Sequence, residues 1–107
     1  MNGVSEVPPR HRLLIDICLA HLVPFLWQGP GLLLISRAGV GAVLAELERR
    51  SITVLGLDGF ELDGALVRPR LDLIYDSDRV PGFPSPDEVI ATWPDDVWVD
   101  VTTGASP

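Results

Sequence analysis

Lysine is absent from this chain of 107 residues, and all eight of its basic residues are arginine. They face fifteen acidic residues, so the formal net charge is −7. Proteins that bind nucleic acid need a basic surface that neutralises phosphates. The charge balance here is the opposite, and we expect no nucleic-acid partner.

Cysteine is nearly absent as well, because Cys18 is the single one. An intramolecular disulfide framework is therefore excluded. Disorder is excluded too, since 47% of the residues are hydrophobic. A chain of this length buries roughly 65% of the surface exposed by its unfolded form, which is enough for a core without metal or disulfide support. We expect one domain over residues 1–107, with flexible ends at 1–9 and 103–107.

The chain also lacks an uninterrupted hydrophobic run long enough to span a membrane, which takes about 20 apolar residues. The apolar stretch 13–35 contains Asp16, His21 and Pro24 and is broken again by a Gly-Pro-Gly turn at 29–31. A secretory signal is disfavoured because no cleavage site with small residues follows before Trp27. We expect no membrane association and a cytoplasmic location.

Groups that could carry catalysis are few. Cys18 and His21 are three residues apart and share one face of a predicted helix, whereas Asp16 lies off that face. A cysteine nucleophile needs electropositive surroundings, and the neighbours of Cys18 are mainly Leu and Ile. We interpret these three residues as structural and expect no catalytic residue.

Metal and nucleotide motifs are missing. A zinc site would need more ligands than two histidines and one cysteine offer at these spacings, and no set of acids matches the calcium-binding EF-hand loop. The glycines at 39 and 41 do not belong to a phosphate-binding loop. We expect no metal and no cofactor.

The first half of the chain predicts two helices. Apolar residues recur at helical spacing over 10–23, and this helix should end near Pro24. Residues 32–35 fit either a short buried strand or the lead-in to the next helix. The stripe Val40, Val43, Leu44 and Leu47, with Ser36 as N-cap, predicts a second helix over 37–50.

The second half predicts strands. Residues 52–55 favour a short strand. Asp63-Gly64 is typical of a two-residue hairpin turn, which would place Leu62 opposite Ala65 and Phe60 opposite Val67. Residues 70–76 fit either a strand or a helical turn, of which we favour the turn because Pro69 interrupts a regular strand.

The end of the chain has two clear patterns. The capping box Ser85-Pro86-Asp87-Glu88 predicts a helix over 86–93. Residues 97–102 alternate strictly, with three valines on one face and Trp98, Asp100 and Thr102 on the other. The predicted fold class is α+β: two N-terminal helices, a small, mainly antiparallel sheet built on a hairpin, a short third helix and a C-terminal strand.

Charge is unevenly distributed along the chain. Residues 1–50 contain five arginines and four acids, whereas residues 51–107 contain three arginines and eleven acids. The acids could serve solubility alone, or they could steer a basic protein onto nearby aromatic anchors. If they serve recognition, the candidate partner-binding residues are Asp58, Glu61, Asp63, Asp72, Asp76, Asp78, Asp95, Asp96, Trp98 and Asp100.

Three segments carry a family resemblance: AVLAELERR, SITVLGLDGFELDG and VRPRLDLIYDSD. Over about residues 40–78 the chain resembles small immunity proteins of bacterial polymorphic-toxin systems. The matching residues are Val54, Leu55, Gly56, Phe60, Asp72 and Asp76. The resemblance implies a non-enzymatic cytoplasmic inhibitor that binds and blocks one cognate toxin.

Two function classes follow. The first is an immunity or antitoxin-like inhibitor that uses an acidic, aromatic-containing surface to block a basic protein toxin. The alternative is a small-molecule-binding or enzymatic α+β domain with a pocket between the 10–23 helix and the sheet, where Asp16, His21 or Tyr75 would be polar contacts. A homodimer that buries the broad apolar surface of the first helix is a third possibility.

Overall fold

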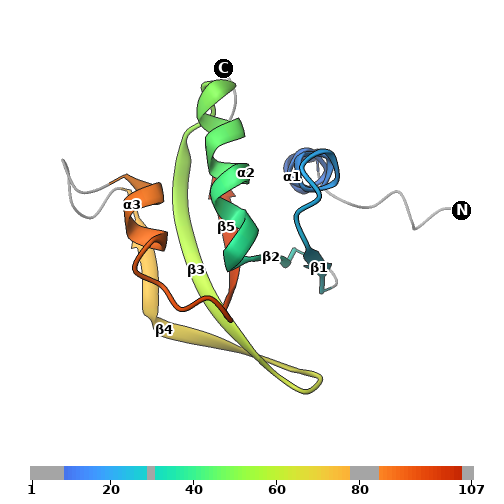
Figure 1. Cartoon of the computed structure of the whole chain (residues 1–107), viewed down its shortest axis with the longest axis vertical. Helices are drawn as coiled ribbons and strands as arrows, with labels where there is room; N and C mark the ends of the chain where they lie inside the picture. The colour runs from blue at the N-terminus through green and yellow to red at the C-terminus, as the bar shows by residue number, and fades with distance from the viewer. Residues whose placement is uncertain (1–8, 29–30, 78–84, 105–107) are drawn as a thin grey trace, which may run out of the picture.

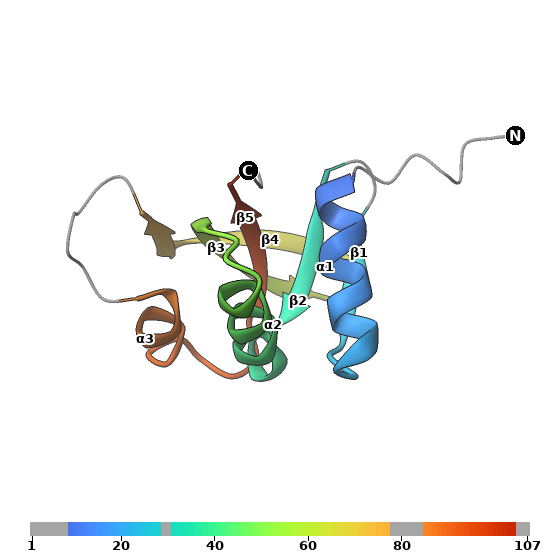
Figure 2. The same ribbon diagram turned by 90° about the horizontal axis from the view of Figure 1, so that it is seen from above.

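The computed structural model describes residues 9–28, 31–77 and 85–104. In these ranges a five-stranded antiparallel sheet, in the order β1-β2-β5-β3-β4, has three helices on one face (Figures 1 and 2). The predicted α+β class is confirmed. The elements are α1 (Pro9–Ala20), β1 (Phe25–Trp27), β2 (Leu33–Ser36), α2 (Arg37–Arg49), β3 (Val54–Asp63), β4 (Leu66–Asp76), α3 (Pro86–Ile90) and β5 (Trp98–Thr103).

The core lies between the helices and the sheet. Each buried aliphatic side chain contributes about 1.5–3 kcal/mol relative to exposure, and all three helices, or the turns that follow them, supply members of one buried cluster. Its helical side includes Leu14, Ile17, Cys18, Val40, Val43, Leu44, Leu47 and Ile90, and its sheet side includes Leu33, Ile35, Leu57, Leu73, Val99 and Val101.

Helix α2 begins where the sequence predicts. The Ser36 side chain accepts a hydrogen bond from the backbone N–H of Gly39 at 3.2 Å, so it is the N-cap. Gly39 also permits a close approach, because a Cβ atom there would lie 2.6 Å from Cγ1 of Val23. The helix therefore packs directly against the chain that leaves α1.

Helix α1 ends at Ala20, three residues before the predicted end. Leu22 has a φ of 57°, and the N–H groups of Leu22 and Val23 donate to the carbonyls of Leu19 and Cys18. These are the bonds of a Schellman motif, in which the left-handed position usually holds glycine. A leucine does not predict this conformation, so the sequence pattern did not show where α1 ends. The strand β1, which follows after Pro24, was not predicted either. Residues 32–35 fitted either a strand or the lead-in to a helix, and the structure shows a strand there, β2.

The hairpin register differs from the prediction. Asp63 pairs with Leu66, so the turn residues are Gly64 and Ala65, and the pairs Leu62 with Ala65 and Phe60 with Val67 are wrong. Gly64 has a φ of +62°, and glycine at the first turn position with positive φ is typical of a type II′ turn. Leu62 therefore opposes Val67, and the strand before the turn runs without a break from Val54.

Strand β4 includes residues 70–76, so the favoured helical turn is wrong. Pro69 fits within it because β4 is an edge strand, whose outer side needs no hydrogen-bond donor. A bulge interrupts the pairing with β3: Asp58 opposes Ile74, but the next residue, Gly59, opposes Arg70. The bulge leaves Leu71 79% exposed.

The two elements predicted at the C-terminal end, a short helix and a strand, are both present. The capping box of α3 is present, with the N–H of Ser85 donating to the Glu88 carboxylate at 2.8 Å, although the helix ends at Ile90 and not at 93. Strand β5 lies in the middle of the sheet, and it extends to Thr103, which was expected in a flexible end. Pro9 was also expected in a flexible end, but it is the first residue of α1; residues 1–8 and 105–107 of the expected flexible ends lie outside the described residues. No helix within the described ranges is long and apolar enough to cross a membrane.

Candidate functional site

The three helices of the described ranges all lie on one face of the sheet, and none of them lies on the other face (Figure 2). Leu57 on β3 and Val99 and Val101 on β5 are buried toward the helices. Since successive side chains of a strand point to opposite faces, their neighbours point away from the helices. We call this surface the open face; it comprises Leu26, Leu34, Asp58, Phe60, Ile74, Asp76, Trp98 and Asp100.

An aromatic pair lies at the centre of the open face. Phe60 on β3 is directly opposite Trp98 on β5, and both are half-buried. Leu34 is fully buried although it lies outside the main core cluster. It pairs with Leu26 and is a diagonal neighbour of Trp98 in the β2–β5 register. The open face therefore has a small apolar patch of its own, which includes the aromatic pair.

Carboxylates adjoin this patch. Asp58 is directly opposite Asp100 on one side and Ile74 on the other, and Asp76 is two residues further along β4. Burial raises the pKa of Asp58 above its usual value, and the nearby charge of Asp76 raises it further. Ile74 is 48% exposed, so apolar surface and negative charge adjoin.

Two of the predicted acids are neutralised on the β3–β4 hairpin. Asp63 forms an ion pair with Arg68 at 2.9 Å. Asp72 accepts two hydrogen bonds from Arg70, at 3.0 and 2.9 Å, and these hold the pKa of Asp72 below its usual value. Glu61 opposes Arg68 and points away from the open face. These three acids therefore belong to mixed-charge surface.

The other predicted acids lie elsewhere. Asp95 and Asp96 are exposed in the turn between α3 and β5, and Asp78 is outside the described residues. The structure thus brings together four of the ten candidates: Asp58, Asp76, Trp98 and Asp100. Leu26, Leu34, Phe60 and Ile74 complete the face and were not among those candidates, because only the strand order shows that they share it.

Asp16, Cys18 and His21, the three residues considered for catalysis, do not form a common site. Cys18 is fully buried, and burial raises the pKa of its thiol to about 11, so the thiol stays protonated and unreactive at neutral pH. Asp16 is exposed, and Nε2 of His21 lies 3.4 Å from a carboxylate oxygen of Glu46 on α2. The described residues include no group of three or more His, Cys, Asp or Glu side chains that could hold a metal ion.

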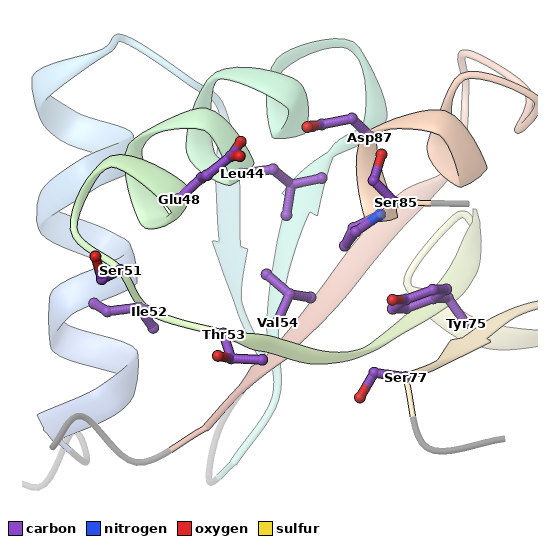
Figure 3. A pocket seen from close by; sticks show the side chains of 11 residues that line it. Leu44, Glu48, Ser51, Ile52, Thr53, Val54, Tyr75, Ser77, Ser85 and Asp87 are labelled. Carbon is purple, nitrogen blue, oxygen red and sulfur yellow. The ribbon is translucent and has the colours of Figure 1, made fainter. Parts of the chain in front are cut away.

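A pocket of about 400 Å³ lies between the C-terminal end of α2, the start of α3 and strands β3 and β4 (Figure 3). Tyr75 lines it, but Asp16 and His21 do not. This pocket is therefore in a different place from the one hypothesised between the first helix and the sheet.

A scan against protein-family models, a search of the curated proteins and a search of the solved structures each find no match for this chain.

Proposed function

We propose that this chain is a non-enzymatic protein-binding domain whose open face docks onto a basic protein. One observation carries the proposal: the half-buried Phe60–Trp98 pair lies next to the opposed carboxylates Asp58 and Asp100, on the side of the sheet away from the three described helices. Large aromatic side chains are the usual anchors of protein interfaces, and charged groups around them steer association. The open face combines both.

The charge of the face favours a basic partner over a second copy of the chain. Two open faces brought together would oppose two sets of three aspartates, and each chain has a net charge of −7. Like charges across an interface cost free energy, whereas a cationic surface would be attracted from a distance. We therefore do not propose a homodimer through this face.

The narrower proposal is an immunity-like inhibitor of a cognate toxin. Its support is the resemblance over residues 40–78, together with a face suited to a cationic protein. A toxin that attacks nucleic acid needs a basic surface to hold phosphates. An acidic domain seated on that surface would block it without any chemistry of its own.

Co-expression tests this proposal. The chain would be produced together with a candidate toxin encoded next to its gene, and growth would be measured. We expect the wild-type chain to protect and the Trp98→Ala variant to lose protection while remaining folded by circular dichroism. Leu71→Ala is the matched control, because Leu71 is an exposed apolar residue on the bulge, outside the open face. Equal protection by all three chains would contradict the proposal.

Small-molecule binding is the second candidate function, and the pocket lined by Tyr75 favours it. The pocket lies on the helix side of the sheet, and the open face lies on the other side (Figures 2 and 3). The two candidates can therefore be tested separately, with substitutions that do not overlap.

A further inference from the structure

We propose that the pocket between α2, α3 and the β3–β4 strands is a binding site for a small organic cation, namely an amine that carries an apolar or aromatic body. This inference deepens the second candidate function, small-molecule binding, and is independent of the protein-binding proposal, since the pocket and the open face are on opposite sides of the sheet. Three features of the pocket support it: its apolar walls, the sign of its charge and its tyrosine.

The inner walls are apolar. Leu44 comes from α2, Val54 from β3 and Tyr75 from β4, and in Figure 3 these side chains surround the interior. Ile52 and Pro86 add further apolar surface. The volume, about 400 Å³, is at the small end of the range of about 300–1,000 Å³ that ligand sites occupy. The body of the ligand should therefore be apolar and no larger than a small ring system.

The charge on the rim is negative. Glu48 on α2 and Asp87 on α3 lie on the same rim and point toward one another (Figure 3). Within the described ranges neither carboxylate takes part in an ion pair, and none of the described residues that line the pocket is basic. Two carboxylates at the entrance attract a cation and repel an anion.

Tyr75 adds a second attraction for the same kind of ligand. Its ring is part of the wall, and the face of an aromatic ring attracts an ammonium group within about 6 Å of its centre. Ser51, Thr53 and Ser77 add polar residues to the lining. The lining therefore suits a cationic head and an apolar body at once.

The test uses phenethylamine as the probe and the full chain as it exists. Two matched compounds keep the ring and change the head: 2-phenylethanol is neutral and phenylacetate is negative. Binding would be followed by amide chemical shifts in a titration at low ionic strength. We expect phenethylamine to shift the amides of Glu48, Val54 and Tyr75 and to bind about ten times more tightly than the alcohol, with no binding of phenylacetate.

Variants separate the parts of the site. We expect Glu48→Gln together with Asp87→Asn to reduce the preference for the amine over the alcohol to about twofold or less. Tyr75→Ala should weaken both ligands, and Asp95→Asn, an exposed acid outside the pocket, should change neither. Equal affinity for amine and alcohol in the wild-type chain, shifts confined to residues outside the pocket, or no saturable binding of phenethylamine would each overturn the proposal.

Discussion

Asp58 on β3 lies directly opposite Asp100 on β5, near the middle of the five-stranded sheet. Like charges in opposed positions of an antiparallel ladder destabilise the fold. Burial and the charge of Asp76 also raise the pKa of Asp58, which means that its ionised form is disfavoured in the folded state. Ionised Asp58 therefore lowers the stability of the folded protein.

The first prediction concerns the stability cost of Asp58. Its pKa in the folded state is raised above 3.8, so ionised Asp58 destabilises the folded protein above that raised pKa. The cost disappears as the pH falls through the folded pKa. We expect Asp58→Asn to increase the free energy of unfolding at pH 7 by a few tenths of a kcal/mol up to about 1 kcal/mol.

Urea unfolding of both chains between pH 7 and pH 3 is the measurement. The advantage of Asp58→Asn over the wild type should shrink as the pH falls and vanish below the unfolded pKa. Asp95→Asn, in an exposed turn, serves as the control and should show little advantage at any pH. A variant that is less stable than the wild type at pH 7 would show that the carboxylate stabilises the sheet.

The second prediction compares two glycines of α2. At Gly39 a Cβ atom would lie 2.6 Å from Val23, so Gly39→Ala should destabilise the protein by about 1–3 kcal/mol. At Gly41 nothing lies within 4 Å of a Cβ atom, so Gly41→Ala should stabilise it by about 0.5–1 kcal/mol. Thermal unfolding distinguishes them, and effects of the same sign would contradict the packing of α2 against the end of α1.

The third prediction concerns the attachment of α3. Nε of Arg37, at the start of α2, donates a hydrogen bond to the carbonyl of Ile90 at 2.6 Å. Hydrogen bonds to charged groups contribute about 1.5–3 kcal/mol. We expect Arg37→Met to lower the free energy of unfolding by an amount in this range and to speed amide hydrogen exchange in α3.

Arg12→Met is the control for Arg37→Met, because Arg12 is an exposed arginine on α1. It removes the same charge without touching α3. If the two variants exchange their α3 amides at the same rate, the contact between Arg37 and Ile90 does not hold the helix in place.

The sequence predicted those elements whose signals are local. The capping box at Ser85 and the N-cap at Ser36 satisfy backbone groups within one turn. The alternation of apolar and polar residues over 97–102 indicates a strand with one buried face. These features do not depend on the rest of the chain. The α+β class followed from them.

The elements that were missed depend on distant neighbours. Pro69 argued against a strand at β4, but an edge position makes it acceptable, and only the assembled sheet shows which strand is at the edge. The end of α1 depends on Leu22 in a left-handed conformation that leucine seldom adopts. The hairpin register depended on which turn position Gly64 occupies, and two turn types compete for it.

The candidate site also depends on residues that are far apart in the sequence. The acids of the second half looked like one group because they are close in sequence. Pairing of the strands divides them, since Asp58 and Asp100 share the open face while Asp63 and Asp72 lie on the hairpin, beside Arg68 and Arg70. The strand order that makes this division could not be derived from the local pattern.

The central claim is that the open face, and not the acidity of the whole chain, recruits a basic protein. The most direct test measures association rates with the toxin against ionic strength for two variants of equal charge change. The first is Asp58→Asn, Asp76→Asn and Asp100→Asn; the second is Asp63→Asn, Asp72→Asn and Asp95→Asn. We expect the first to slow association about tenfold at low salt and to flatten its salt dependence, and the second to stay within about twofold of the wild type. Equal effects of the two variants would contradict the claim and leave the acids with a role in solubility alone.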